Sequence, residues 1–127
     1  MSQNVQINRN LKINSVTYGE SRTVTLDTPS ALIEVIGSGI TDKQVIFPVD
    51  YSQLQVVCLH STQNLTLETN SGSSPTDTIS RTANVAKVWY TGESSCPFTA
   101  DCTNIYVTNA TGSAATLTMV ICYDSTP

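Results

Sequence analysis

The stretch Thr103–Asp124, T-N-I-Y-V-T-N-A-T-G-S-A-A-T-L-T-M-V-I-C-Y-D, decides the fold. Large apolar residues occupy every second position from Leu117 to Tyr123, over a length typical of one β-strand. A shorter alternating run surrounds Ile105 and Val107, and turn-forming residues separate the two runs. We therefore predict a hairpin of two core strands. Its inward face should pack on the apolar face of a second strand pair. The inward residues are predicted to be Ile105, Val107, Leu117, Met119 and Ile121, facing Leu54, Val56, Leu65 and Leu67.

The rest of the chain contains further short segments of the same kind. A second hairpin is predicted at Leu54–Asn70, and Pro48 in Val45–Val49 indicates an edge strand or a strand end because proline cannot donate to a central ladder. No segment keeps a helical period over three turns. The remaining strand candidates are Leu11–Asn14, Val16–Tyr18, Arg22–Asp27, Ala31–Ile36, Thr78–Ser80 and Val85–Tyr90. About eight to ten short strands with regular turns predict an all-β fold, an antiparallel, jelly-roll-like β-sandwich.

The chain is expected to form one domain with an N-terminal extension. Its 127 residues are enough for a single hydrophobic core. Residues 1–10 are polar and rich in Asn and Gln, which predicts an arm that becomes ordered on contact or frays. The domain itself is predicted to span residues 11–127.

Composition excludes several classes of function. Ser and Thr make up 34 residues, and only 13% of the chain is charged, so the surface is polar without being strongly charged. The net charge of −4 and the scattered basic residues argue against binding to nucleic acid or to an anionic membrane. The N-terminus lacks the apolar core of a signal peptide, and no apolar run reaches membrane-spanning length. We therefore expect synthesis in a cytoplasm.

The four cysteines and the single histidine offer little reactive chemistry. Cys58 and Cys122 lie in predicted strands and are expected to be buried free thiols. Cys96 and Cys102 flank a loop, where a disulfide is an open alternative that a reducing compartment disfavours. His60 shares a strand face with Cys58, but we interpret it as a rim histidine beside a thiol. No catalytic residue is therefore assigned, and the chain is expected not to be an enzyme.

Neither a metal nor a cofactor is expected to bind. Asp77 and Asp101 lie in loops rich in oxygen donors, but no EF-hand spacing surrounds them. The Gly37-Ser38-Gly39 segment is not followed by a helix, so it predicts a turn and not a phosphate loop. Aromatic residues remain as candidates for contact with a partner or, alternatively, for stacking on a sugar. The predicted interface residues are Tyr51, Trp89, Tyr90 and Phe98; Tyr106 and Tyr123 are further candidates for sugar stacking.

The second half of the chain resembles the decoration, or cement, proteins that bind outside the capsid lattice of tailed bacteriophages. The similar segments are Asn64–Ser71, Pro75–Ile79, Val88–Gly92 and the closing hairpin Thr103–Asp124 with its end Ser125–Pro127. The resemblance implies a jelly-roll-like sandwich that assembles as trimers or dimers on capsid axes, and it carries no catalytic residue. Thr- and Asn-rich hairpins also occur in tail and spike proteins.

We therefore expect a non-enzymatic virion structural protein that stabilises a phage capsid from outside. Its expected partners are the major capsid protein and further copies of itself, with a trimer favoured over a dimer. The expected location is the capsid surface, after synthesis in the host cytoplasm. Two alternatives stay open: a tail, baseplate or head-fibre component, and a carbohydrate-binding β-sandwich module.

Overall fold

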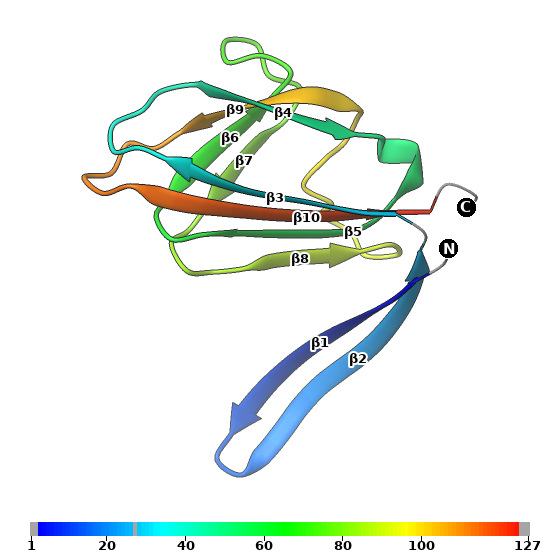
Figure 1. Cartoon of the computed structure of the whole chain (residues 1–127). Helices are drawn as coiled ribbons and strands as arrows, with labels where there is room; N and C mark the ends of the chain where they lie inside the picture. Colours follow the sequence, from blue (N-terminus) through cyan, green and yellow to red (C-terminus); the bar gives the residue numbers. More distant parts are fainter. Residues whose placement is uncertain (1–2, 27, 125–127) are drawn as a thin grey trace.

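The computed structural model describes residues 3–26 and 28–124, and these form ten strands and one short 3-10 helix (Figure 1). Strands β1 and β2 form a hairpin, and the other eight build a sandwich. The hairpin strands are β1 (Gln3–Ile13) and β2 (Val16–Leu26). The sandwich strands are β3 (Thr28–Ile36), β4 (Lys43–Val49), β5 (Leu54–Ser61), β6 (Leu65–Thr69), β7 (Thr78–Arg81), β8 (Lys87–Tyr90), β9 (Cys102–Thr108) and β10 (Ala115–Tyr123). The helix η1 spans Tyr51–Gln53, where the Asp50 carboxylate accepts from the Ser52 amide.

The sandwich has jelly-roll topology. One sheet has the order β3-β10-β5-β8, and the other has the order β4-β9-β6-β7. The first four strands of the sandwich pair antiparallel with its last four in reverse order: β3 with β10, β4 with β9, β5 with β8, and β6 with β7. This is the pattern of one long hairpin rolled into two packed sheets. The predicted all-β, jelly-roll-like sandwich is confirmed.

The two predicted core hairpins are wrong as pairings, although their strands exist. In Thr103–Asp124, β9 pairs with β4 and β6, whereas β10 pairs with β3 and β5 in the opposite sheet. Strands β5 and β6 of Leu54–Asn70 are likewise divided between the sheets. Each connection crosses from one sheet to the other, so consecutive strands face one another across the core.

The crossover between β9 and β10 is held by one buried polar side chain. Asn109 has no exposed surface, and its amide nitrogen donates to the carbonyl oxygens of Ile36 (3.1 Å) and Ser113 (2.9 Å). Its side-chain oxygen accepts from the amide and the hydroxyl of Thr111. Because a buried amide is tolerated only when it is hydrogen-bonded, these contacts fix the course of the turn.

The main core lies between the two sheets and contains nearly all of the predicted inward residues. Ile105, Val107, Leu117, Met119 and Ile121 are fully buried there, together with Leu54, Leu65 and Leu67. Val56 is the exception, since it points outward beneath the N-terminal hairpin. The pairing of β5 with β10 shifts register between Cys122 and Tyr123, opposite Val56 and Leu54, so alternation predicted the wrong face.

The position of Pro48 at a sheet edge agrees with the sequence prediction. Strand β4, which carries Pro48, is an edge of its sheet, and β7 is the other edge. In the second sheet, β3 and β8 are the edges.

The N-terminal hairpin, residues 3–26, points away from the sandwich (Figure 1). The sequence predicted a polar arm over residues 1–10. Residues 1 and 2 of that arm lie outside the described residues, and residues 3–10 form strand β1, which continues to Ile13. The turn at Asn14 and Ser15 reverses the chain, with Asn14 at a φ of 56° that asparagine tolerates better than most residues. The projecting element is therefore a complete antiparallel hairpin.

Candidate interaction site on the N-terminal hairpin

The N-terminal hairpin has one apolar face and one polar face. The register pairs Val5 with Val24 and Leu11 with Tyr18, so odd-numbered residues of β1 share a face with even-numbered residues of β2. That apolar face contains Val5, Ile7, Arg9, Leu11, Ile13, Val16, Tyr18, Glu20, Arg22, Val24 and Leu26. The opposite, polar face contains Asn4, Gln6, Asn8, Asn10, Lys12, Thr17, Gly19, Ser21, Thr23 and Thr25. Strands with one apolar face and one polar face usually bury the apolar face against another part of the structure.

The half of the apolar face nearest the sandwich is covered by the chain's own sheet. This docked half comprises Val5, Ile7, Val24 and Leu26. Its residues pack on the outer face of the β3-β10-β5-β8 sheet, and Leu26 is only 1% exposed. The sheet contributes Val56, Tyr90 and Cys122, flanked by the half-buried Val88 and Val120. This second cluster is separate from the core between the sheets, so the hairpin has a hydrophobic anchor of its own.

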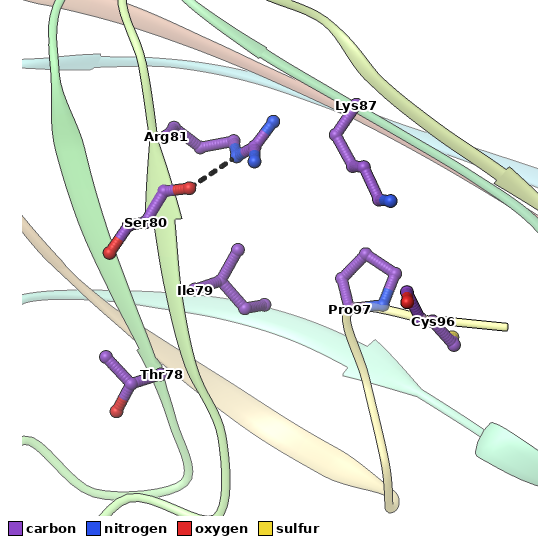
Figure 2. Close-up of a pocket in the computed structure, with 8 residues that line it drawn as sticks. Thr78, Ile79, Ser80, Arg81, Lys87, Cys96 and Pro97 are labelled. Atoms are coloured by element: carbon purple, nitrogen blue, oxygen red, sulfur yellow. Dashed lines mark hydrogen bonds between the residues drawn. The ribbon is translucent and has the colours of Figure 1, made fainter.

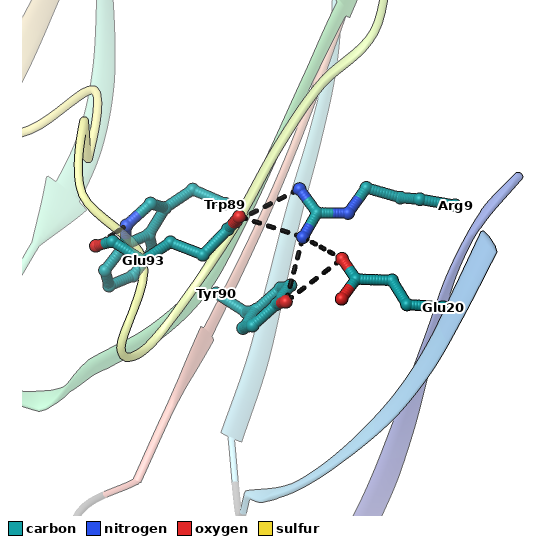
Figure 3. A network of polar contacts seen from close by, with 5 residues as sticks. All are labelled: Arg9, Glu20, Trp89, Tyr90 and Glu93. Carbon is teal, nitrogen blue, oxygen red and sulfur yellow. Dashed lines mark hydrogen bonds and ion pairs between the residues drawn. The ribbon is translucent and has the colours of Figure 1, made fainter. Parts of the chain in front are cut away.

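A polar clamp fixes the middle of the hairpin to the end of β8 (Figure 3). Arg9 donates to the two carboxylate oxygens of Glu93 at 3.2 and 2.8 Å, and it also pairs with Glu20. The Tyr90 hydroxyl accepts from Arg9 at 2.8 Å and donates to Glu20 at 3.1 Å. Trp89 holds the turn that carries Glu93, because its indole nitrogen donates to the Glu93 carbonyl oxygen at 2.9 Å. The clamp thus connects β1, β2 and the turn after β8.

Electrostatics within the clamp favour the charged forms of its members. The hydrogen bond from Arg9 is the largest influence on Glu93 and holds its pKa below the ordinary value of 4.5. The hydrogen bond to Glu93 in turn raises the pKa of Arg9. The guanidinium groups of Arg9 and Arg22 lie 4.8 and 4.7 Å from the centroid of the Tyr90 ring, within cation–π range.

The half of the apolar face beyond the clamp is exposed. This distal half comprises Leu11, Ile13, Val16 and Tyr18, which are 52 to 61% exposed. Leu11 pairs with Tyr18 and Ile13 with Val16, so the four side chains form one continuous patch at the end of the hairpin. A contiguous exposed apolar patch on a projecting element is typical of a surface that contacts another molecule.

The sheet beneath the hairpin also has an uncovered apolar region. A groove of about 440 Å³ runs beside β1, lined on the hairpin side by Val5–Asn8. The sheet side of the groove is mainly apolar and consists of Pro29, Val56, Cys58, Val88, Val120 and Cys122. Farther along the same outer face, on edge strand β3, Ile33 and Val35 are 70 and 58% exposed. Groove and edge together form an apolar strip next to the docked half of the hairpin.

Three of the four interface residues predicted from sequence lie inside the monomer. Phe98 is fully buried, and Trp89 packs in the main core at 8% exposure. Tyr90 is buried beneath the N-terminal hairpin, at 6% exposure, and so contacts its own chain. Only Tyr51, at 44%, is on the surface. The sequence does not show whether an isolated aromatic residue is covered by its own chain or by a partner; here the core covers Phe98 and Trp89, and the hairpin covers Tyr90.

The cysteines are all free thiols. The disulfide left open for Cys96 and Cys102 is not formed, and the Cys102 sulfur instead lies 3.8 Å from the Phe47 carbonyl oxygen inside the core. Burial raises the pKa of Cys102 to about 11, and it also raises the pKa of Cys58 and of Cys96. His60 does share the outer face of β5 with Cys58, as predicted, but a raised thiol pKa opposes formation of a nucleophilic thiolate.

The loop carboxylates considered as calcium ligands tie loops together. Asp77 accepts from the amide and the hydroxyl of Thr99 at 2.9 and 2.6 Å. Asp101 accepts from the Tyr51 amide at 2.8 Å. Across residues 3–26 and 28–124, no three or more His, Cys, Asp or Glu side chains gather into a group that could hold a metal ion.

A second, shallower hollow of about 320 Å³ lies between β7 and the loop before β9 (Figure 2). Arg81 stands on one side with the other residues of β7, and Lys87, Cys96 and Pro97 stand on the other. Arg81 donates its Nε hydrogen to the Ser80 carbonyl oxygen at 2.9 Å. The hollow is wide open, and the raised pKa of Cys96 does not favour covalent chemistry there.

The fold and the exposed surface define a class: a jelly-roll domain with a clamped, projecting hairpin. Comparison with models of protein families, with curated proteins and with solved structures finds no match to this chain. Among the described residues, no helix is long and apolar enough to cross a membrane. The hairpin, its clamp and the apolar strip are therefore the features that a functional proposal has to explain.

Proposed function

We propose that the protein is a non-enzymatic virion structural protein that binds the outside of a phage capsid and stabilises it. The resemblance of the second half to decoration proteins supports this role. So does the architecture, because a sandwich of two packed sheets suits a part that holds its neighbours in place. A polar surface rich in Ser and Thr suits wet, repeated contacts.

The exposed distal half of the N-terminal hairpin is the observation that carries the proposal. A hairpin that extends its apolar face beyond its own domain is suited to contact another subunit. The clamp and the docked half already hold it in one orientation, so little further ordering is needed when a partner binds. An enzyme gains nothing obvious from such an element, whereas an assembling protein does.

The proposed partners are the major capsid protein and further copies of this chain. Closed symmetric oligomers are the common form of such assemblies, and they fit the symmetry axes of a capsid. The proposed location is the capsid surface, after synthesis in the host cytoplasm. A tail, baseplate or head-fibre position uses the same assembling surface and is the second candidate.

Binding to undecorated capsids tests the proposal. Purified protein is mixed with capsids that lack it, and co-sedimentation is followed by a reconstruction of the particles. Density on the outer capsid surface, together with a higher temperature of capsid disruption, is the expected result. Absence of binding and of density would overturn the proposal, and density confined to the tail would favour the second candidate.

The geometry removes Trp89 from the candidate residues of a carbohydrate-binding module. The Trp89 ring is part of the main core, and its indole nitrogen is used by the Glu93 carbonyl oxygen. A stacking platform requires an exposed ring face, which Trp89 does not offer.

A further inference from the structure

The free edge of β1 borders the groove on the outer face of the β3-β10-β5-β8 sheet. Among the described residues, strand β1 pairs only with β2, and its residues Val5–Asn8 line the groove. An unpaired strand edge presents a row of amide and carbonyl groups that can accept a further strand. The floor of the groove is apolar, so an added strand would need an apolar face as well.

The hairpin register shows which groups point toward that edge. The two-residue turn makes Ile13 and Val16 a hydrogen-bonded pair, and such pairs alternate along an antiparallel ladder. The N–H and C=O groups of Gln6, Asn8 and Asn10 therefore point away from β2, along the free edge that borders the groove at Gln6 and Asn8.

The strand that fits this edge is present on the chain itself. It must be amphipathic and must carry an uncovered apolar face, and the distal half of the hairpin has both properties. The distribution of charge also favours a second copy of the chain as the source of the added strand. Residues 3–26 contain three of the six basic residues and one of the ten acidic residues, a net charge of +2, which leaves −6 on the rest of the chain. A hairpin of positive charge is attracted to the acidic body of another copy.

We propose that two copies form a two-fold dimer in which their β1 strands pair antiparallel. The two hairpins then make one four-stranded sheet in the order β2-β1-β1-β2. The distal half of each hairpin fills the groove of the other copy. Leu11 of one copy lies beside Val5 of the other, and Tyr18 reaches toward Ile33 and Val35 of edge strand β3. One contact thus covers the distal half, the free edge and the apolar strip.

The two-fold axis passes near Asn8. Centring the pair there sets Leu11 opposite Val5 and Arg9 opposite Ile7, and it uses the outward groups of Gln6, Asn8 and Asn10. Centring at Arg9 would place two arginines directly opposite each other, which is unfavourable. Centring at Ile7 would leave Ile13 outside the contact. The residue pairs repeat in both directions, as an isologous interface requires.

The inference shares with the proposed function the requirement that the chain assembles, but it needs no capsid. Analytical ultracentrifugation of the purified full chain at micromolar concentration tests it. The expected mass is twice the chain mass of 13.6 kDa. A monomer or a trimer would overturn the inference. A dimer that fails to bind capsids would contradict the proposed function alone, and a monomer that binds capsids would contradict the dimer alone.

A matched pair of proline variants locates the contact. Asn8→Pro removes an N–H on the proposed axis, and Ser21→Pro, at the residue paired with Asn8, removes an N–H on the opposite edge of the hairpin. Neither N–H bonds within the hairpin, so both variants should keep their fold by circular dichroism. Because the axis doubles the effect, Asn8→Pro should weaken the dimer by about 100-fold, and Ser21→Pro should leave it unchanged. Equal dissociation constants for the two variants would overturn the proposed pairing.

Discussion

Replacing Leu26 by alanine should release the N-terminal hairpin from the sandwich without unfolding the sandwich. Leu26 is 1% exposed in the second cluster, where it contacts the outer face of the sheet. The substitution removes three carbon atoms, worth about 0.8 kcal/mol each when buried. The hairpin forms a sheet of its own and belongs to neither sheet of the sandwich, so it can shift into the space left and keep the cavity cost small. The expected loss of docking free energy is about 2.5 kcal/mol, at the low end of the range for such changes.

Limited trypsin cleavage after Arg22 measures this loss. Arg22 is paired in strand β2, and its side chain lies on the Tyr90 ring in the docked state, so we expect cleavage there to require the hairpin to open. When opening is fast relative to cleavage, the rate follows the open population. A loss of about 2.5 kcal/mol should therefore accelerate cleavage about 60-fold. The measurement is made at high dilution, where contacts between copies do not protect the site.

Leu11→Ala is the matched control, since the residue type and the face of the hairpin are the same. Leu11 is 61% exposed, so the substitution should cost less than about 1 kcal/mol and change the cleavage rate less than about fivefold. Similar acceleration by the two variants would refute the division of the hairpin into a docked half and a distal half. The division would also be refuted if Trp89 fluorescence in Leu26→Ala were lost as fast as the chain is cleaved. Trp89 reports on the main core, so that result would mean that the sandwich unfolds together with the hairpin.

Three further predictions concern the clamp, the core and the thiols. Because the pKa of Glu93 is lowered in the folded state, the stabilisation that its carboxylate gives to the clamp is complete above pH 4.5 and is lost as pH falls further. Hydrogen exchange in β1, corrected for the intrinsic exchange rate at each pH, should therefore accelerate over that range in the native chain. A Glu93→Gln variant that keeps the same acceleration would contradict the clamp. Phe98→Ala should lower the free energy of unfolding in urea by about 3 to 5 kcal/mol, and Tyr51→Ala by less than about 1 kcal/mol; equal effects would show that Phe98 is not the core residue described. With a pKa of about 11, Cys102 should react with a thiol reagent at pH 8 only after denaturation, and fast labelling in the native state would contradict its burial.

Much of the sandwich was predictable from alternation. Strands β9 and β10, and the burial of Leu117, Met119 and Ile121, follow from period-2 patterns that tertiary structure did not change. The edge position of β4 followed from Pro48. The pairing of strands was not predictable in this way, because alternation shows which face of a strand is buried but not which strands lie next to each other. In this jelly roll, the outer strand pairs join segments far apart in the sequence, as β3 with β10 and β4 with β9.

The candidate site was only partly predictable. Alternation begins at Val5, but the many Asn and Gln residues of the polar face made residues 1–10 resemble a disordered arm. The same alternation of Val5, Ile7 and Leu11 with Asn and Gln could have revealed β1. The clamp pairs Arg9 with Glu93, residues far apart in the chain, and only the fold brings them together. Trp89 and Tyr90 were predicted to contact a partner because sequence does not show that the core and the hairpin cover them.

Residue-resolved hydrogen exchange along the N-terminal hairpin tests the central claim most directly. The amides of Gln6, Asn8 and Asn10 point to the proposed contact, and those of Thr17, Gly19 and Ser21 point to the opposite edge of the hairpin. In a concentrated sample, the first set should be protected and the second set should exchange quickly, and dilution should remove the difference. Equally fast exchange of both sets at every concentration would contradict the pairing of two hairpins through β1.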